Sequence, residues 1–468
     1  MSDEYDLIVL GGGPVGENVA DRAVQGSLTT VIVESELVGG ECSYWACMPS
    51  KALLRSPQAL RAAQHVQGVI GGTLDPAEVL ARRDSFTSHW SDEGQVEWLN
   101  SAGIDLVRGH GRLSGEREVT VMTDGVERVL RARHAVAIST GTDATIPRIP
   151  GLAEAAPWTS RDATSAQEVP ESLAIIGGGV VGVEMATAYA QLGSRVTLIA
   201  RGGLLAKTEP FAGDRVADGL RGLGVDVRLN TETTAVRRDG EQVVITLGED
   251  EVTASEVLVA TGRTPQTDDI GIEVVGLRPG RSIDVDDTMR VTGIDWLYAV
   301  GDVNGRALLT HQGKYQARAA GDVIAARSRG EVVADQPWGR HVATADNAAV
   351  PQVVFSEPEV ASVGLTADAA RAAGHEIEVV DNDLGRVAGA SLHADDYRGQ
   401  ARMIVDTERD VVLGVTFVGP DVAEMLHAAT IAVVGEIPLS RLWHAVPAYP
   451  TMNEIWLRLL EEYGRQSA

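Results

Sequence analysis

Short apolar runs bounded by glycine recur along this chain, and they predict the order of its elements. Residues 5–9 are apolar and β-prone, and the turn GGGPVG follows at 11–16. Residues 17–24 suit a helix, and LTTVIVE at 28–34 gives a second strand. A glycine-rich turn between a strand and a helix, followed by another strand, is typical of a βαβ unit. The chain is therefore expected to open with a dinucleotide-binding unit.

The same pattern returns in residues 173–201, which read LAIIGGGVVGVEMATAYAQLGSRVTLIAR. Its glycines follow those of the first turn by 166 positions (177 − 11, 179 − 13, 182 − 16). A strand-bearing segment follows each unit, at 133–151 and at 255–265. The repeat therefore covers whole domains. The glycines concerned are Gly11, Gly13 and Gly16 in the first unit and Gly177, Gly179 and Gly182 in the second.

The pattern changes in the last third of the chain. WLYAVGDVNG (296–305) predicts a strand that ends in an acidic turn, and a helical pattern covers 310–326. From Pro351 onward, apolar runs predict antiparallel strands followed by a helix, which indicates a separate α+β unit. We predict an α/β protein with two Rossmann-like dinucleotide-binding domains and a C-terminal α+β domain. The boundaries are placed near Pro150, Pro265 and Val350.

The charge balance narrows the choice of partners. Among 468 residues, 40 are basic and 66 are acidic, which gives a net charge of −26. Such a surface repels phosphate backbones and anionic lipid headgroups, so neither nucleic acid nor a membrane is expected as a partner. The N-terminal sequence MSDEYDLIVLGGG has no basic stretch or cleavage site typical of a leader, and no apolar run reaches ~18 residues. We expect a cytoplasmic protein.

The glycines and one acidic residue of the first unit fit a nucleotide site. A dinucleotide fold needs glycine at the tight turn, at the pyrophosphate and at the contact between helix and strand, the places of Gly11, Gly13 and Gly16. Glu34 follows the last of them by 18 residues (34 − 16), where a carboxylate can accept hydrogen bonds from both ribose hydroxyls of an adenosine.

The second unit departs from this pattern at the ribose position. The residue 18 positions after Gly182 is Ala200, and Arg201 and Lys207 follow it. A carboxylate would repel a 2′-phosphate, whereas these cations supply the positive charge that such a phosphate requires. The sequence therefore favours NADPH over NADH, with NADH still possible. The alternative is that Arg201 is an ordinary surface charge.

Cysteine occurs only at Cys42 and Cys47, within VGGECSYWACMPSK directly after the first unit. Five residues apart on a distorted helix, two cysteines can approach to the ~4.4 to 6.8 Å between Cα atoms that a disulfide demands, with strain that makes the bond reducible. A zinc site needs further cysteine or histidine ligands, and none are near, so no metal site is predicted. We predict a redox-active disulfide.

At this point the sequence resembles the FAD-dependent pyridine nucleotide disulfide oxidoreductases, a family that includes dihydrolipoyl dehydrogenase, glutathione reductase and mercuric reductase. The resemblance spans essentially the whole chain. It rests on GGGPVG, GGECSYWACMPSK, STG (Ser139 to Gly141), GGGVVGVE, ATGRTP (260–265), AVGD (Ala299 to Asp302) and PTMNE (Pro450 to Glu454).

The resemblance implies an FAD on the first unit, with Gly141 and Asp302 among its ligands and Asp302 on the flavin ribityl chain. Cys47 would face the isoalloxazine as the charge-transfer thiol, and Cys42 would meet the substrate. Lys51 would lie near flavin N5 and pair with Glu184. The C-terminal unit resembles the family's dimer interface domain, so a homodimer is implied.

The domains implied by the resemblance follow the boundaries given above. Residues 1–150 and 266–345 would form the FAD-binding and central parts, 151–265 the NAD(P)-binding domain, and 346–468 the dimerisation domain.

The motif breaks at one position. Most relatives that act on disulfides or dithiols carry a histidine base immediately before the Pro-Thr, where this chain has Tyr449. A phenol is neutral at pH 7, so it can donate a hydrogen bond but is a poor proton acceptor. Glu454 remains, without an imidazole to orient. His444 could substitute through a loop shift, although an ordinary surface role is the more economical interpretation.

Tyrosine at this position resembles mercuric reductases and soluble transhydrogenases. Neither match is complete. Mercuric reductases add a cysteine pair near the carboxyl terminus, whereas no thiol follows Cys47 in this chain. Soluble transhydrogenases lack the second redox cysteine, which is present here as Cys47.

We therefore expect an NAD(P)H-dependent FAD flavoprotein reductase that passes a hydride through flavin to the Cys42–Cys47 disulfide. The electrons would continue to a small acceptor, which could be a disulfide, a quinone or a metal ion. Two alternatives stay open: a dihydrolipoyl dehydrogenase that uses another base, and a nonenzymatic sensor that binds both nucleotides and changes partner when the disulfide is reduced.

Overall fold

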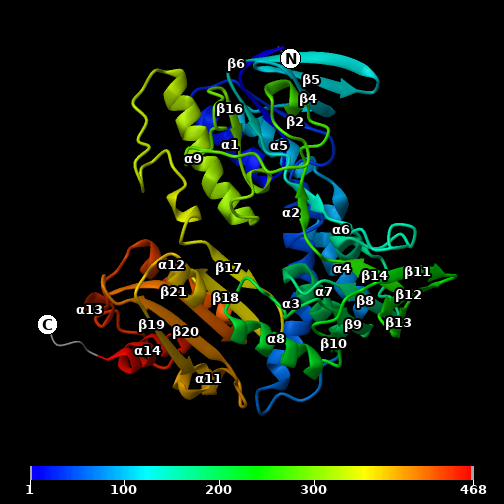
Figure 1. The fold of residues 1–468 in the computed structure, drawn as a ribbon, viewed down its shortest axis with the longest axis vertical. Coiled ribbons are helices and arrows are strands. Elements are labelled where there is room, and N and C mark those ends of the chain that lie inside the picture. Colours follow the sequence, from blue (N-terminus) through cyan, green and yellow to red (C-terminus); the bar gives the residue numbers. More distant parts are fainter. Residues whose placement is uncertain (1–2, 465–468) are drawn as a thin grey trace. The chain divides into compact units, whose positions relative to one another are not determined.

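The computed structural model describes residues 3–464, and the chain divides into two compact units (Figure 1). The first unit comprises Met1–Pro49, Asp84–Thr145 and Arg263–Asp346. The second comprises Ser50–Arg83, Ile146–Gly262 and Asn347–Ala468. Each unit is therefore assembled from three separate stretches of the chain.

A seven-stranded sheet forms the centre of the first unit. Its order is β3-β2-β1-β6-β5-β4, with β16 paired to β6. Strands β3, β2, β1, β6 and β16 run parallel, whereas β4 and β5 join β6 as an antiparallel meander. The strands are β1 (Glu4–Leu10), β2 (Thr30–Glu34), β3 (Asp105–Arg108), β4 (His110–Gly115), β5 (Glu118–Thr123), β6 (Val126–Ile138) and β16 (Leu297–Ala299).

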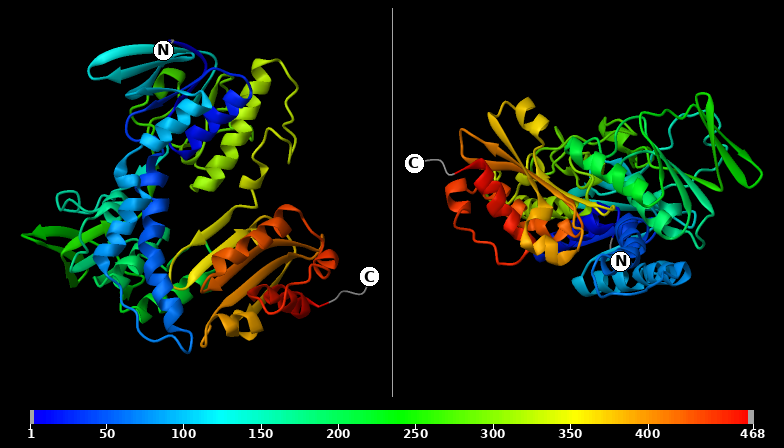
Figure 2. Two further views of the ribbon diagram at one scale, coloured as in Figure 1. Left: turned by 180° about the vertical axis from the view of Figure 1, so that it is seen from behind. Right: turned by 90° about the horizontal axis from the view of Figure 1, so that it is seen from below.

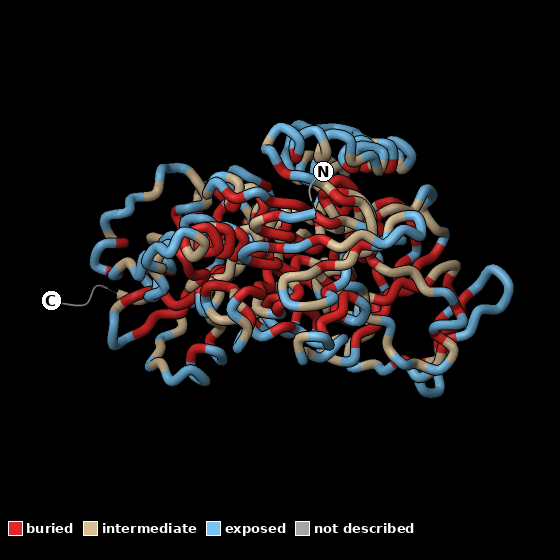
Figure 3. Tube along the Cα trace, turned by 90° about the horizontal axis from the view of Figure 1, so that it is seen from above, coloured by how far each residue is buried: buried red, intermediate tan, exposed pale blue. Residues whose placement is uncertain are grey.

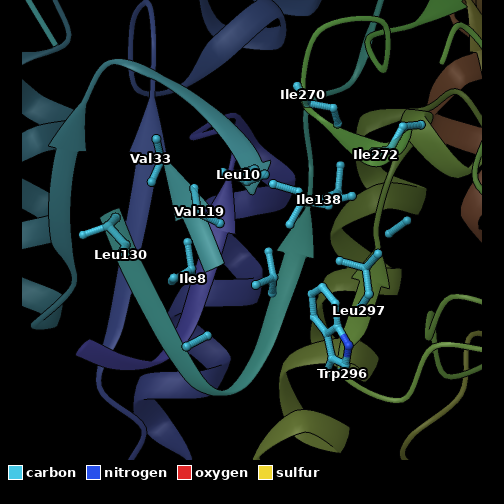
Figure 4. Close-up of a cluster of buried hydrophobic side chains, with 14 of the residues drawn as sticks. Ile8, Leu10, Val33, Val119, Leu130, Ile138, Ile270, Ile272, Trp296 and Leu297 are labelled. Atoms are coloured by element: carbon cyan, nitrogen blue, oxygen red, sulfur yellow. The ribbon is translucent and has the colours of Figure 1, made fainter. Parts of the chain in front are cut away.

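Alternate residues of β1 face two different hydrophobic cores. Ile8 and Leu10 pack with the antiparallel meander and with Ile270 and Ile272, as Figure 4 shows. Leu7 and Val9 belong to the opposite core, which α1 and α9 cover. Because both faces of the parallel part are covered, β1 reads as a continuous apolar run.

Helices α1 and α9 lie side by side in the first unit (Figure 1). Its helices are α1 (Pro14–Gln25), α2 (Gly40–Tyr44), α5 (Glu93–Ala102) and α9 (Thr310–Ser328). Short 3-10 turns are η1 (Ser88–Trp90), η2 (Ile272–Val275), η3 (Asp302–Asn304) and η4 (Thr344–Asp346). The short strands β7 (Thr142–Ala144) and β15 (Arg263–Pro265) form an antiparallel pair.

The second unit contains a parallel sheet in the order β10-β9-β8-β14 and a small antiparallel sheet in the order β11-β12-β13. The strands are β8 (Ser172–Ile176), β9 (Arg195–Ile199), β10 (Asp226–Arg228), β11 (Ala235–Asp239), β12 (Gln242–Leu247), β13 (Asp250–Ala254) and β14 (Glu256–Val259). The helices are α3 (Cys47–Gln64), α4 (Pro76–Phe86), α6 (Ser160–Ser165), α7 (Val180–Gln191) and α8 (Pro210–Gly222), of which α3 begins and α4 ends in the first unit. Helix α7 follows α1 by 166 residues at both ends (180 − 14, 191 − 25), the repeat that the sequence predicts.

The C-terminal part of the second unit is a five-stranded antiparallel sheet in the order β17-β18-β21-β20-β19. Helix α12 packs on β17, β18 and β21, and α14 packs on β19 and β20 (Figure 2). The strands are β17 (Pro351–Val354), β18 (Glu359–Gly364), β19 (Ile377–Asp383), β20 (Gln400–Asp406) and β21 (Val411–Gly419). The helices and turns are α10 (Ala367–Ala372), η5 (Leu384–Arg386), α11 (Ala388–His393), η6 (Val422–Met425), α12 (Leu426–Val434), α13 (Leu439–Leu442), η7 (Met452–Glu454) and α14 (Ile455–Tyr463).

The predicted fold class is confirmed: two parallel, dinucleotide-type sheets are followed by an antiparallel α+β part. Buried segments concentrate on the sheet strands and the helices that cover them, while hairpin tips and loops are exposed (Figure 3). Across residues 3–464, no helix combines the length and apolar character needed to cross a membrane.

Candidate active site

The first glycine-rich turn joins β1 to α1, and close contacts shape it. Gly11 has a φ of +98°, and a Cβ there would meet the carbonyl oxygen of Ser139. A Cβ on Gly16 would meet the carbonyl oxygen of Gly11. Gly13 caps α1, and the nearest atom to a Cβ there is the Cα of Gly40 at 3.9 Å. Gly11 and Gly16 therefore allow the close backbone contacts of the turn, and Gly13 leaves the N-terminus of α1 accessible to an anion.

The second glycine-rich turn, between β8 and α7, repeats this geometry. Gly177 has a φ of +129°, and a Cβ there would meet the carbonyl oxygen of Ala260. A Cβ on Gly182 would meet the carbonyl oxygen of Gly177. Gly179 caps α7, and a Cβ there would find no atom within 4 Å. Two separate sheets therefore present the same open helix N-terminus.

The residue opposite each turn differs between the two units. The backbone N–H of Gly12 donates to Oε2 of Glu34 at 2.6 Å, and that of Glu36 donates to Oε1 at 2.7 Å. In the second unit, a Cβ on Gly178 would lie 3.0 Å from the Cβ of Ala200. The sequence separation is 22 in both cases (34 − 12, 200 − 178). Ala200 therefore occupies the place of Glu34, as the sequence predicts.

Arg201 and Lys207 lie in the segment after β9, and both side chains are exposed. Their charges are therefore available to a ligand at the end of that strand.

Asp302 begins the turn after β16 and accepts a hydrogen bond from the hydroxyl of Thr142 at 3.1 Å. The Nε of Arg263 donates to the same hydroxyl oxygen at 2.6 Å. Burial raises the pKa of Asp302, and the hydrogen bond from Thr142 and the charge of Arg263 oppose this shift. Gly141 immediately precedes Thr142 with a φ of +75° and open space at its Cβ position. Both predicted ligands thus lie in the unit that carries the first turn.

The two cysteines lie on separate helices, not on the single distorted helix that the sequence suggested. Cys42 belongs to α2 and Cys47 begins α3, because the backbone at Trp45 leaves the helical region with a φ of −135°. Both residues are thiols. A hydrogen bond with Cys47, together with burial, raises the pKa of Cys42. The sulfurs are therefore adjacent, as a redox pair requires.

The thiol pair faces α9. The Sγ of Cys47 lies 3.4 Å from the hydroxyl oxygen of Thr310. The charge of Lys314, one helical turn further along, favours the thiolate of Cys42. Sequence reasoning predicted helix α9 but assigned no role to Thr310 or Lys314, because nothing in a single helical pattern tells which face meets the cysteines.

A pocket of about 490 Å³ also reaches α9. Residues of α1, α5 and α9 line it: Glu17, Asn18, Gly94, Gln95, Trp98 and Lys314. Burial raises the pKa of Glu17 to about 7. No pattern in the sequence predicts this pocket, since its lining comes from three segments that are far apart along the chain.

Lys51 and Glu184 form the ion pair that the resemblance implies. The Nζ of Lys51 lies 2.7 Å from Oε2 of Glu184, whose side chain is 4% exposed. The other oxygen, Oε1, accepts from the backbone N–H of Phe355 at 3.0 Å. The ammonium of Lys51 also lies 5.0 Å from the centre of the Phe355 ring.

Tyr449 and Glu454 differ sharply in burial. Tyr449 is 78% exposed, whereas Glu454 is buried and accepts a hydrogen bond from the backbone N–H of Gly389 at 3.2 Å. His444 is exposed. Among residues 3–464, no hydrogen bond joins Glu454 to either ring. The carboxylate of Glu454 is instead anchored to α11 through the backbone of Gly389.

Sequence profiles of known protein families show to which family the chain belongs. The sequence profile described as "Pyridine nucleotide-disulphide oxidoreductase" matches residues 5–329, and that described as its dimerisation domain matches 350–459. The chain belongs to this family.

Individual proteins are also similar to this chain over almost its whole length. A dihydrolipoyl dehydrogenase from Chlorobaculum tepidum is 31% identical over 97% of this chain and 96% of its own length. A mercuric reductase from Streptomyces lividans is 32% identical over 96% of this chain and 94% of its own length. Among solved structures, the Cu(II) complex of the HOCl-induced flavoprotein disulfide reductase RclA from Escherichia coli matches with a TM-score of 0.84 and 25% identity. It covers 98% of this chain and 99% of that chain.

Membership fixes the broad chemistry. Pyridine nucleotide-disulphide oxidoreductases are enzymes that use FAD and a pyridine nucleotide, and the predictions of an oxidoreductase and a flavoprotein are thereby confirmed. The match to the dimerisation domain agrees with the expected homodimer at the level of the family.

The first unit fits an FAD. The N-terminus of α1 is open at Gly13, and the carboxylate of Glu34 lies beside it. Ser139 adds a buried hydroxyl with no hydrogen-bond partner among the described residues, at the end of β6 and next to Gly11. Buried hydroxyls are almost always hydrogen-bonded, so this one indicates a missing ligand group. The polar atoms needed to hold a dinucleotide thus converge on one edge of the sheet.

Proposed function

We propose that this protein is an NADPH-preferring, FAD-dependent reductase that delivers electrons through Cys42 and Cys47 to a small acceptor whose reduction does not need the family's histidine base. The observation that carries the proposal is the hydrogen-bonded thiol pair in the unit with the FAD-type cradle, in a chain with Tyr449 at the histidine position.

The first unit would hold FAD through its own residues. The N–H groups at the start of α1, beside Gly11, Gly13 and Gly16, would bind the pyrophosphate, and Glu34 would accept from the ribose. Asp302 would accept from the ribityl hydroxyls, with Gly141 giving close backbone approach. FAD would supply the two-electron chemistry that connects a nicotinamide to a dithiol.

The second unit would hold the nicotinamide coenzyme. Gly177, Gly179 and Gly182 shape a second open helix N-terminus for its pyrophosphate. Because residue 200 is alanine, no carboxylate stands at this position to repel a 2′-phosphate. The exposed side chains of Arg201 and Lys207 supply positive charge at the same strand end. These residues support a preference for NADPH, with NADH as a weaker alternative.

The redox residues divide into two roles. Cys47, which contacts the hydroxyl of Thr310, would face the isoalloxazine, and Cys42 would meet the acceptor. Lys51 would present its ammonium to the flavin, held in place by Glu184. Oxidation of the dithiol to a disulfide releases two electrons and two protons, and the acceptor takes up the electrons.

The acceptor half is where this chain departs from its disulfide-reducing relatives. Loss of a general base costs ~10² to 10⁴ in rate for proton-coupled steps. Tyr449 can donate a hydrogen bond but does not replace that base, and Glu454 is already bound to the backbone of Gly389. Glu454 would then be a positioning residue for the segment that carries Tyr449. We propose that both act from the partner subunit of a homodimer.

Anaerobic titration with NADPH tests the relay. The expected result is a long-wavelength thiolate-to-flavin absorption band after two electrons, lost in Cys47→Ser and retained in Cys42→Ser. Steady-state rates with lipoamide, glutathione disulfide, Hg(II) and a naphthoquinone then define the acceptor class. Purified protein that takes up no FAD, or flavin reduction without the band, would overturn the proposal.

Two results would point to the other interpretations. Dihydrolipoamide turnover at a rate typical of enzymes, abolished by His444→Ala, would identify a dihydrolipoyl dehydrogenase with a different base. Flavin reduction by NADPH that no soluble acceptor reverses would favour a redox sensor.

A further inference from the structure

The segment between β9 and α8, residues 200–209, carries both cations that the proposed function assigns to the coenzyme. Arg201 and Lys207 are exposed on it, one near each end. In the middle of the segment, the backbone N–H of Leu205 donates to the carbonyl oxygen of Gly178 at 2.9 Å. This hydrogen bond holds the segment against the second glycine-rich turn.

Glu209 ends the segment, and its side chain is only 3% exposed. It occupies the N-cap position of α8, yet among the described residues its side chain caps no N–H of that helix. Its Oε1 instead accepts from the backbone N–H of Ala367, in α10, at 2.7 Å. Its Oε2 lies 2.8 Å from Nη1 of Arg402, on β20. A buried carboxylate is tolerated only with such partners, so the C-terminal part of the chain fixes this end of the segment.

Arg402 is itself held in one orientation. Its Nε and Nη2 donate to Oδ1 and Oδ2 of Asp381, on β19, at 2.8 and 2.7 Å. Its guanidinium also lies 5.0 Å from the centre of the Phe211 ring, in the first turn of α8. A planar guanidinium that serves two carboxylates and an aromatic ring has little freedom to turn. All these residues belong to the second unit, so the anchor of Glu209 lies within one compact body.

We propose that Glu209 is a positioning residue for coenzyme selection: held by Arg402, it keeps Arg201 and Lys207 arranged for the 2′-phosphate of NADPH. This inference rests on the proposed function, because it explains how the coenzyme preference of that function is maintained. Glu209 acts through Lys207, two residues before it, and not through the coenzyme itself. A cation on a fixed segment loses less conformational freedom when it binds a phosphate than a cation on a loose one.

The choice between the two coenzymes separates this role from general support of the fold. NADPH and NADH share the pyrophosphate, which the N-terminus of α7 would bind in both cases. They differ in the 2′-phosphate, which only the cations of residues 200–209 would contact. Loosening this segment should therefore weaken NADPH and spare NADH, whereas general damage to the second unit should weaken both.

Glu209→Gln is the first test, made in the holoenzyme. Glutamine keeps the size of the side chain and an acceptor for the N–H of Ala367, but it removes the charge that pairs with Arg402. The KM for NADPH should rise ~10-fold, while kcat and the KM for NADH stay within about twofold. Titration calorimetry with adenosine 2′,5′-bisphosphate and with AMP gives a readout without turnover. The affinity for the bisphosphate should fall ~10-fold and that for AMP should not change.

Arg402→Lys tests the same anchor from the C-terminal part, and it keeps the proposal testable if Glu209→Gln fails to fold. Lysine retains the positive charge, but a single ammonium cannot reproduce the fork that joins Glu209 to Asp381. We expect the same selective loss of affinity for adenosine 2′,5′-bisphosphate, smaller than in Glu209→Gln. Arg402 lies in the stretch that matches the dimerisation domain, where no coenzyme contact is predicted.

A matched control is Glu251→Gln, which makes the same change on the small sheet of the second unit. It breaks an exposed pair with Arg237, whose Nη1 lies 2.7 Å from Oε1 of Glu251. The affinities for adenosine 2′,5′-bisphosphate and for AMP should both stay at the wild-type level.

Equal losses for adenosine 2′,5′-bisphosphate and AMP would overturn the proposal, because Glu209 would then only support the fold. Unchanged affinities in both Glu209→Gln and Arg402→Lys would overturn it as well. Lys207→Ala combined with Arg201→Ala separates this failure from that of the proposed function. If that variant loses affinity for the bisphosphate while the anchor variants do not, the coenzyme preference stands and only the anchor fails. If it loses none, the 2′-phosphate is bound elsewhere, and the preference and the anchor both fail.

Discussion

The ammonium of Lys51 and the carboxylate of Glu184 lie 2.7 Å apart, and the carboxylate is almost completely buried. Its second oxygen accepts from the backbone of Phe355, so neither oxygen is left without a partner. Burying a charge is tolerable only when such partners satisfy it.

This ion pair predicts an asymmetric double-mutant cycle. Lys51→Met leaves the Glu184 carboxylate buried without its countercharge and should cost about 3 kcal/mol of unfolding free energy. Lys51→Met combined with Glu184→Gln should recover most of that loss, because an amide needs no countercharge. Chemical denaturation of the apoprotein measures both. The control is Arg195→Met, which breaks an exposed pair with Glu171 and should cost under about 1 kcal/mol. Equal losses of unfolding free energy in Lys51→Met and Arg195→Met would contradict the interpretation of Lys51–Glu184 as a buried ion pair.

The glycine turns predict opposite effects for neighbouring substitutions. Gly182→Ala should destabilise the second unit, because its Cβ would meet the carbonyl oxygen of Gly177. Gly179→Ala should fold normally, since space is open and its φ is −83°, yet it should raise the KM for NADPH several-fold by crowding the pyrophosphate. Thermal unfolding and steady-state kinetics separate the two. A Gly179→Ala variant with unchanged KM would show that no coenzyme lies at that helix N-terminus.

Coenzyme choice is predicted to depend on the end of β9. Ala200→Glu with Arg201→Ala should lower kcat/KM for NADPH at least tenfold and leave NADH largely unaffected, because the new carboxylate repels a 2′-phosphate and can accept from a free ribose hydroxyl. Kinetics with both coenzymes at equal ionic strength measure the ratio. A matched loss for NADPH and NADH would place the discrimination elsewhere.

Patterns confined to one segment were predictable from the sequence. The two βαβ units, the offset between α1 and α7, and the match of Ala200 to Glu34 follow from glycine spacing, because a tight turn and a close helix contact leave no other residue possible at Gly16 and Gly182. The pairing of Lys51 with Glu184 came from resemblance, since nothing local in either segment indicates it.

Features that depend on the meeting of distant segments were not predictable. The sequence does not predict that β4 and β5 form a meander on the first sheet, because nothing in their residues indicates which sheet they extend. The break between α2 and α3 lies at Trp45. Because tryptophan also occurs within helices, the sequence does not indicate that a helix ends there. Glu17, Trp98 and Lys314 come together only when α1, α5 and α9 pack.

The buried carboxyl of Glu17 predicts a pH-dependent stability that is independent of catalysis. Its pKa is about 7 in the folded protein against an ordinary value of 4.5, so between these values the folded state binds more protons than the unfolded state. Stability should therefore fall as pH rises from about 4.5 to about 7 and stay at the lower level above that. Glu17→Gln removes the charge, so its advantage over wild type should be absent near pH 4.5 and reach on the order of 3 kcal/mol above pH 7.5, an upper limit at ~1.4 kcal/mol per pKa unit. Urea unfolding of the apoprotein at pH 5, 6, 7 and 8 measures the difference, with Glu97→Gln as the exposed control. A constant difference across this range would mean that Glu17 titrates as an ordinary carboxyl.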